Sequence, residues 1–265
     1  MKSVSISDLS ILLVEPSLMQ RKIILSMLEE SGAQKIEGVG SAEEALIRLQ
    51  TFIPDLVISN LYSGEMTGAD LVMKLRQSEK MEHIPFMLIS SENRFKALDP
   101  VRQAGVVAIL PKPFEIKALK RALAATVDFI EAEELDLEHY DIEDIRVLLV
   151  DDSNTARKHI ARVLESLGVK HITTANNGKE ASKLIDESIF DLIVTDYNMP
   201  EMDGEALIQH IRQNTHLSHV PILMVTSESN NARLANIQQE GMSAVCDKPF
   251  EPQDVRSTLA RLLSE

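Results

Sequence analysis

Short apolar runs alternate with amphipathic segments along the second half of the chain. The runs are rich in β-branched residues and nearly continuous, which is typical of strands buried on both faces. They span residues 147–150, 171–175, 192–195, 222–225 and 244–246. The segments between them carry apolar residues at helical spacing, such as Ile160, Val163, Leu164 and Leu167, with Gly168 as a stop signal. This alternation predicts a parallel sheet of five strands with helices on both faces.

The first half of the chain repeats the second half at an offset of 136 residues. With this offset, the motif Lys112-Pro113-Phe114-Glu115 falls on Lys248-Pro249-Phe250-Glu251, and further matches run along the chain without an obvious gap. The period is much longer than the roughly 20–50 residues of solenoid units, so each copy is expected to be a whole domain. We predict a domain at 1–130, an acidic linker or helix extension at 131–144, and a second domain at 145–265.

Composition and charge narrow the classes of function. The net charge is −14, which disfavours direct binding to nucleic acid, because affinity for phosphate backbones depends on Lys and Arg. Residues 131–144 hold eight acidic side chains and no Lys or Arg, which predicts a solvated connector or, alternatively, a docking strip for a basic partner. The single cysteine, Cys246, excludes an internal disulfide and favours the cytoplasm. No apolar run reaches the roughly 20 residues needed to span a membrane.

Polar side chains follow the ends of four predicted strands in the second domain. Asp151 and Asp152 follow the first strand, Asp196 the third, Thr226 the fourth and Lys248 the fifth. Ligands bind beyond the carboxyl ends of the strands in open α/β sheets, so we expect these groups to lie close together. Three carboxylates at close range call for a cation, and oxygen ligands with room for water favour Mg²⁺ over zinc. Each residue alone has an ordinary explanation, such as a helix N-cap or a surface lysine, but their combination predicts a phosphoryl-binding site.

Four sequence runs in the second domain resemble the receiver domain of two-component response regulators. They are VLLVDDS at 147–153, DLIVTDYNMPEMDG at 191–204, PILMVTS at 221–227 and DKPF at 247–250. The resemblance covers residues 145–265 throughout, and residues 9–131 resemble the same family. It implies an α/β fold of two doubly wound, flavodoxin-like receiver domains, each with a parallel five-stranded sheet in the order 2-1-3-4-5.

The resemblance also implies roles in phosphoryl transfer. Asp196 matches the phosphoacceptor of the family, Thr226 the hydroxyl that moves to the phosphoryl group, and Lys248 the lysine that pairs with it. The phosphoryl group then comes from a histidine kinase or a histidine phosphotransfer protein. Asn198 and Glu228 match the positions that flank the attacking water in the family. We expect this pair to make the phosphorylated state short-lived.

The same resemblance implies a Mg²⁺ site. Asp152 matches a direct ligand, Asp151 the acid that binds the metal through water, and the backbone carbonyl of Asn198 the third protein ligand, beside Asp196. One departure concerns an aromatic that the family often carries three residues before the lysine, because Val245 stands there instead. The resemblance therefore does not extend to the usual coupling between that aromatic and the threonine.

The first domain departs from the family at the site itself. Glu15-Pro16 replaces the acid pair, and the acceptor position holds Asn60, whose amide is a poor nucleophile. Glu15, Lys112 and Ser90 remain, and we expect a direct ion pair between Glu15 and Lys112 where the metal would lie. We interpret this domain as a degenerate receiver that has lost phosphotransfer.

Two further expectations concern the lysine–proline bonds of both domains and the acceptor of the first. The family commonly has a cis peptide bond between the lysine and the proline that follows, so we expect one at Lys112-Pro113 and at Lys248-Pro249. The alternative to a degenerate site is a live domain with a displaced acceptor, such as Glu65 or Ser59.

The predicted function is a response regulator that signals by contact between proteins. No DNA-binding or cyclase segment follows the second domain, so we expect an output protein of unknown identity, with homodimerisation as a further option. A phosphate sink or relay intermediate is the alternative within signalling. A haloacid-dehalogenase-like phosphatase is a distant alternative, because it would need an acid where Asn198 stands. We therefore expect self-catalysed phosphorylation and dephosphorylation only, and no enzymatic turnover.

Overall fold

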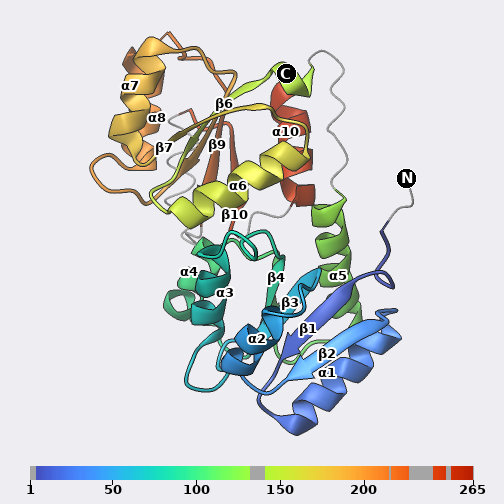
Figure 1. Cartoon of the computed structure of the whole chain (residues 1–265). Coiled ribbons are helices and arrows are strands. Elements are labelled where there is room, and N and C mark those ends of the chain that lie inside the picture. The colour runs from blue at the N-terminus through green and yellow to red at the C-terminus, as the bar shows by residue number, and fades with distance from the viewer. Residues whose placement is uncertain (1–3, 132–140, 215, 227–240, 249–251, 265) are drawn as a thin grey trace. The chain divides into compact units, whose positions relative to one another are not determined.

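The computed structural model divides the chain into two compact units, residues 1–131 and 132–265 (Figure 1). It describes residues 4–131, 141–214, 216–226, 241–248 and 252–264. Each unit contains one sheet of five parallel strands, which confirms the predicted fold class. Within these described ranges, every helix is too short or too polar to cross a membrane.

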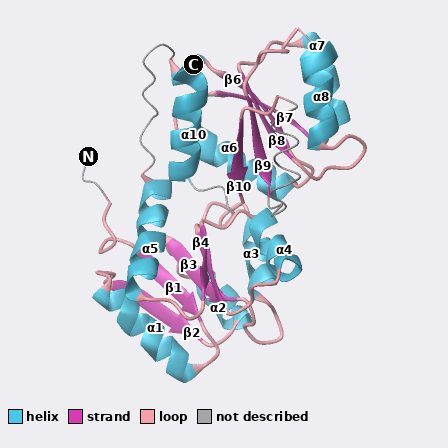
Figure 2. Cartoon of the chain, turned by 180° about the vertical axis from the view of Figure 1, so that it is seen from behind, coloured by secondary structure: helices cyan, strands magenta, loops and turns pink. Residues whose placement is uncertain are grey.

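The first unit has the predicted strand order, β2-β1-β3-β4-β5. Its strands are β1 (Ser10–Val14), β2 (Lys35–Val39), β3 (Leu56–Asn60), β4 (Phe86–Ser90) and β5 (Ala108–Pro111). Its helices are α1 (Leu18–Glu30), α2 (Ala42–Leu49), α3 (Gly68–Arg76), α4 (Phe95–Gln103) and α5 (Ile116–Ile130). Helices and strands alternate along the chain, and the helices cover both faces of the sheet (Figure 2).

The second unit repeats this order as β7-β6-β8-β9-β10. Its strands are β6 (Arg146–Val150), β7 (His171–Ala175), β8 (Leu192–Asp196), β9 (Ile222–Thr226) and β10 (Ala244–Asp247). Its helices are α6 (Asn154–Ser166), α7 (Gly178–Glu187), α8 (Gly204–Asn214) and α10 (Pro252–Ser264). Asp196 and Thr226 are the last residues of β8 and β9, and both still pair with a neighbouring strand. The helix expected between β9 and β10 falls on residues outside the described ranges.

Local signals bound the first helix of each unit. In the second unit, the hydroxyl of Ser153 accepts a hydrogen bond from the backbone N–H of Ala156 at 3.2 Å and caps α6, as Ser17 caps α1. Helix α6 gives way to Gly168, whose φ of 106° is a conformation that favours glycine. Because the cap lies two residues after Asp151, the turn that carries this acid is short and well defined.

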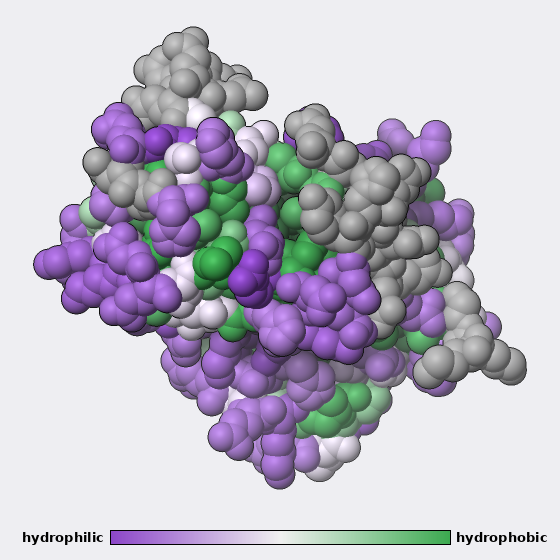
Figure 3. Space-filling model, turned by 90° about the horizontal axis from the view of Figure 1, so that it is seen from above, coloured by the Kyte–Doolittle hydropathy of each residue, from purple (hydrophilic) through white to green (hydrophobic). Residues whose placement is uncertain are grey.

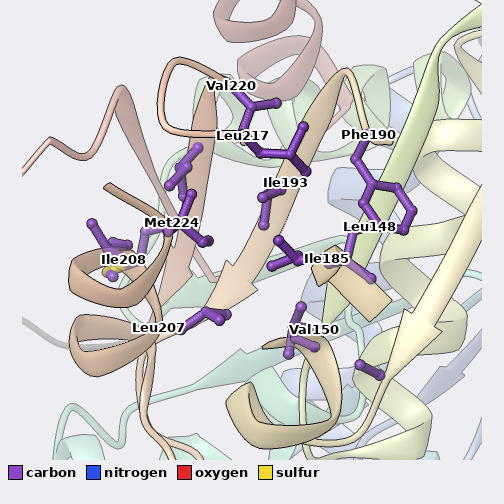
Figure 4. Close-up of a cluster of buried hydrophobic side chains, with 14 of the residues drawn as sticks. Leu148, Val150, Ile185, Phe190, Ile193, Leu207, Ile208, Leu217, Val220 and Met224 are labelled. Carbon is purple, nitrogen blue, oxygen red and sulfur yellow. The ribbon is translucent and has the colours of Figure 1, made fainter. Parts of the chain in front are cut away.

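One core cluster of the second unit lies between the sheet and the helices α7 and α8 (Figure 4). Leu148 and Val150 from β6 and Ile193 from β8 point toward Ile185 of α7 and Leu207 of α8, and all five are fully buried. Each such side chain contributes about 1.5–3 kcal/mol to folding relative to its exposed state. This packing holds the strands whose carboxyl ends carry the polar residues.

The surface is polar, in keeping with the net charge of −14. Hydrophilic residues cover most of the face shown in Figure 3, with smaller apolar areas between them. Within the acidic segment 131–144, the described residues are Glu131, which caps α5, and 141–144, which include a 3₁₀ turn at Ile142–Asp144. The remainder of that predicted linker lies outside the described residues.

Candidate functional site

The carboxyl edge of the second sheet brings one lysine into contact with two aspartates. Nζ of Lys248 lies 2.9 Å from Oδ2 of Asp151 and 3.1 Å from Oδ1 of Asp196. Asp151 follows β6, Asp196 ends β8 and Lys248 follows β10, so the contact joins three strands that are distant in sequence. All three residues are buried, with at most 5% of their surface exposed. The structure thus places these three predicted site residues side by side.

Backbone contacts fix both ends of this bridge. Oδ1 of Asp151 accepts a hydrogen bond from the backbone N–H of Ser153 at 2.8 Å, and the guanidinium of Arg157 donates to the carbonyl oxygen of Asp151. The backbone N–H of Lys248 donates to the carbonyl oxygen of Thr226 at 2.8 Å, which extends the pairing of β10 with β9. Sequence reasoning did not assign Arg157 to the site, although an arginine stands at the same place in both copies.

Burial shifts the pKa of Asp196 upward, to about 6. Loss of hydration is the largest cause, Lys248 opposes it, and the negative charge of Asp151 adds to it. Burial alone would lower the pKa of Lys248, but the attraction of Asp151 and Asp196 outweighs burial and raises it. Lys248 is therefore charged at neutral pH, while ionisation of Asp196 is less favourable than that of an exposed aspartate.

Three carboxylates at this edge form a candidate cation site. One oxygen each from Asp151, Asp152 and Asp196 lie within 4.8 Å of one another. Asp152 is exposed, whereas Oδ2 of Asp196 is buried and has no hydrogen-bond partner among the described residues. A buried carboxylate oxygen without a partner is unfavourable, and a hard cation that prefers oxygen ligands would satisfy it. The donor set therefore fits Mg²⁺.

The other predicted site residues lie around this cluster. Thr226 is buried at the end of β9, the strand that pairs with β8, so it stands one strand away from Asp196. Asn198 lies in the loop between β8 and α8 and is exposed. Val245 stands where the family often carries an aromatic residue. It is partly buried on β10 and packs against the core of the unit. Glu228 lies outside the described residues.

In the first unit, the corresponding pocket is occupied by its own side chains. Oε2 of the buried Glu15 accepts hydrogen bonds from Nζ of Lys112 at 2.7 Å and from Nδ2 of Asn60 at 3.1 Å. Oε1 of Glu15 accepts from the backbone N–H of Ser17 at 3.0 Å, and Lys112 also donates to Gln20 at 2.8 Å. The expected ion pair between Glu15 and Lys112 is confirmed. The contribution of Gln20 was not foreseen, because no motif marks it.

Other groups of this pocket take no part in the ion pair. The hydroxyl of Ser90 is buried and accepts from the backbone N–H of Glu92 at 3.0 Å. The hydroxyl of Ser59, considered as a displaced acceptor, is buried and donates to the carbonyl oxygen of Asn60 at 2.9 Å, which argues against that role. The peptide bond before Pro113 is cis, as predicted, whereas its counterpart in the second unit involves a residue outside the described ranges.

Comparison with known proteins gives a consistent match. A model of the response regulator receiver domain matches residues 11–124 and again residues 147–260. The chain is 32% identical over 120 residues to the chemotaxis protein CheY-3 of Vibrio cholerae, which covers 45% of this chain and 92% of that protein. It is 33% identical over 118 residues to the chemotaxis protein CheY of Pseudomonas aeruginosa, covering 44% and 95%. The solved structure of the chemotaxis response regulator CheY4 of Vibrio cholerae covers 44% of this chain and 98% of its own, with 32% identity and a TM-score of 0.42.

The two matched segments contain both polar edges described above. The first includes Glu15 and Lys112, and the second includes Asp151, Asp196 and Lys248. Together they span most of the chain, and each covers all but the first residue of a parallel sheet with the predicted strand order. The chain therefore belongs to the response regulator receiver family and carries two receiver domains in tandem.

Proposed function

We propose that the second unit is the phosphorylatable receiver and that Asp196 is its phosphoacceptor. The observation that supports this best is the asymmetry of the carboxylate. Oδ1 of Asp196 contacts Lys248 at 3.1 Å, while Oδ2 is buried without a hydrogen-bond partner among the described residues. One oxygen therefore pairs with Lys248, and the carboxylate keeps a second oxygen that no described protein group binds. Receiver domains generally interact with histidine kinases or histidine phosphotransfer proteins, and we assign the same class of donor here.

The transfer proceeds by nucleophilic attack of a carboxylate oxygen of Asp196 on the phosphorus of a phosphohistidine. A P–O bond forms and the P–N bond to the donor imidazole breaks. The imidazole, which carries a proton on its other ring nitrogen, leaves with the electron pair of that bond and becomes neutral histidine. Lys248 remains beside the acceptor and offsets negative charge on the transferred group, and Thr226 offers a hydroxyl donor from the adjacent strand.

Asp151, Asp152 and Asp196, with the backbone carbonyl of Asn198, are the groups that we assign to Mg²⁺. When bound, this ion supplies positive charge to the oxygens of the phosphoryl group. The chain itself prepares the site, because Asp151 holds Lys248 in place through the 2.9 Å contact. Burial opposes ionisation of Asp196, and added positive charge at the cluster favours the carboxylate form that is needed for attack.

We propose further that the first unit is not phosphorylated. Its acceptor position holds Asn60, and the single acid, Glu15, is neutralised by Lys112. The unit then serves as a protein-contact module of the same fold. The protein signals by contact with a partner protein in the cytoplasm and does not turn over external substrates. The relatives named as chemotaxis proteins support this class of signalling protein.

Incubation of the full chain with acetyl phosphate and Mg²⁺ tests the assignment. Intact-mass analysis should show one added phosphoryl group, and Asp196→Asn should abolish it. Asp191→Asn is the matched control, because it removes a carboxylate from the opposite end of the same strand, where Asp191 pairs with Arg146. A label that persists in full after Asp196→Asn would disprove the assignment.

A further inference from the structure

The loop between β8 and α8 is strained at one residue. Glu201 has a φ of 65°, a left-handed conformation that residues other than glycine rarely adopt. The backbone N–H of Met202 donates to the carbonyl oxygen of Pro200 at 2.7 Å, which makes these residues a γ-turn of the rare, strained type. Such a turn persists only where surrounding contacts hold it. The loop joins Asp196 to α8 and includes Asn198, so its path matters for the site.

The start of α7 supplies those contacts. The backbone N–H of Gly178 donates to the carbonyl oxygen of Met202 at 3.1 Å. Nδ2 of Asn177 donates to Oε1 of Glu201 at 3.2 Å, and Nζ of Lys179 lies 3.5 Å from Oε2 of the same carboxylate. Asn177, Gly178 and Lys179 therefore all contact the strained turn, and we call this set of contacts the α7 clamp.

Gly178 leaves no room for a side chain. A Cβ atom at this position would lie 2.7 Å from the carbonyl oxygen of Met202, a backbone atom that cannot move without displacing the turn. The first unit has Ala42 at the equivalent position, and its loop takes another path. There Ala42 donates its backbone N–H to the carbonyl of Ser63 at 3.0 Å, and the left-handed residue is Gly64, with a φ of 108°. The two loops have equal length, but the first is held by other contacts, because the carboxylate of Glu43 there accepts a hydrogen bond from the backbone N–H of Met66 at 3.0 Å.

We propose that Asn177, Gly178 and Glu201 are positioning residues that set the Mg²⁺ affinity of the second unit. This proposal rests on the proposed function, in which Asn198 supplies a backbone carbonyl to the ion. The clamp fixes the turn that begins two residues after Asn198, and it thereby restricts the backbone on which that carbonyl lies. Mg²⁺ demands near-ideal octahedral geometry, so a small displacement of one ligand weakens binding. Loss of partners beyond the direct ligands commonly lowers metal affinity by about 10- to 100-fold.

Exchange of the two hydrogen-bonding partners tests the clamp without disturbing the helix cap. The side chain of Asn177 also accepts from the backbone N–H of Glu180 at 2.8 Å, and an aspartate caps equally well. Asn177→Asp loses the amide donor and faces Glu201 with a like charge. The double variant with Glu201→Gln restores the hydrogen bond in the opposite direction, because the glutamine amide now donates to the aspartate. Its net charge equals that of the wild type.

The measurement is the Mg²⁺ dissociation constant of the full chain, taken from an NMR titration. We expect Asn177→Asp to raise it about tenfold and the double variant to restore it nearly to the wild-type value. A double variant as weak as Asn177→Asp would overturn the proposal, since a merely structural role of position 177 would not respond to the partner.

Gly178→Ala gives a second test with a control inside the same chain. We expect it to raise the dissociation constant by at least about tenfold, because the added methyl displaces the backbone of Met202. Ala42→Gly makes the reverse change at the matching helix start and should leave Mg²⁺ binding unchanged. Wild-type affinity in both Gly178→Ala and Asn177→Asp would refute the clamp and leave the site assignment intact. Absence of saturable Mg²⁺ binding in the wild type would refute both.

Discussion

Lys112 and Glu15 form a direct ion pair in the first unit, with 2.7 Å between Nζ and Oε2 and only 17% and 3% of the two side chains exposed. The equivalent lysine of the second unit, Lys248, contacts two acids instead of one. The charges in the first pocket balance, whereas the second pocket keeps an excess of negative charge. Several measurable differences between the units follow from this contrast.

Removal of one partner of the first pair should destabilise the first unit. Lys112→Met leaves the carboxylate of Glu15 buried with only the Asn60 amide and the Ser17 backbone as donors, and we expect a loss of about 3 kcal/mol in the free energy of unfolding. Adding Glu15→Gln should recover part of the loss, because the uncompensated charge is then absent. Denaturant unfolding measures both variants. Lys117→Met, at an exposed position of α5, is the control and should change stability little. Equal stability of Lys112→Met and the control would contradict this expectation.

The pKa of Asp196 predicts an unusual dependence of stability on pH. Its folded-state value of about 6 lies above the unfolded value of about 3.9, so the native state binds more protons between these values. Stability without metal therefore falls as pH rises from about 4 to 6, by roughly 2–3 kcal/mol from this group. Asp196→Asn should remove the loss. With a chelator present, the Asp196→Asn variant should have a higher free energy of unfolding than the wild type at pH 7. Below about pH 4, the two proteins should be equally stable. Urea unfolding at several pH values checks this, and a destabilised variant at pH 7 would contradict it.

Mg²⁺ should stabilise the second unit alone. A ligand that binds only the folded state at 100 times its dissociation constant contributes about 2.7 kcal/mol. We expect thermal unfolding of the second unit to shift upward with Mg²⁺ in the wild type, and the shift to vanish in Asp152→Asn. Amide resonances around Glu15 should stay unchanged during the titration. A saturable change in the resonances of the first unit would contradict this expectation, because Mg²⁺ would then displace Lys112 from Glu15.

Much of this site was predictable because burial on both faces leaves a clear sequence pattern. Strands such as Leu192–Asp196 follow directly from apolar runs, and the acids and the lysine at strand ends share one edge in any parallel sheet. The edge strand His171–Ala175 is largely exposed, so burial on both faces does not explain it. The repeat also gave the contrast between Asn60 and Asp196. The pairing of Glu15 with Lys112 followed from charge alone, since they were the acid and the base that remained.

The sequence could not show the left-handed turn at Glu201 or the reason for Gly178. A glutamate gives no local signal for a positive φ, because its preference is for the opposite sign. Only the approach of Met202 to α7 in three dimensions explains why that helix starts with glycine. The bridge from Lys248 to two acids at once was equally hidden, because distances between side chains depend on the register of three strands.

The lifetime of the phosphorylated state gives a further prediction. The exposed side chain of Asn198 and the side chain of Glu228, which lies outside the described residues, are the groups that we expect to admit water to the acyl phosphate. Glu228→Leu should slow hydrolysis severalfold by excluding water and should leave phosphorylation itself intact. The measurement is the decay of phosphorylated protein after removal of acetyl phosphate in excess Mg²⁺. If the decay is the same in both proteins, position 228 has no influence on the rate.

The amide of Asn60 limits how many forms of the chain a phosphoryl donor can produce. A tandem pair with two working acceptors exists in mixed forms, and the proportion of each form depends on donor concentration. With Asn60 tied to Glu15 in a pocket whose charges cancel, the proposed function leaves one covalent variable, at Asp196. Occupancy should then follow a single-site saturation curve. A partner protein that binds both receivers would contact a first receiver that stays the same and a second receiver that changes on phosphorylation. The bound fraction of the partner would then follow the phosphorylated fraction of Asp196, with no singly modified intermediate between two sites.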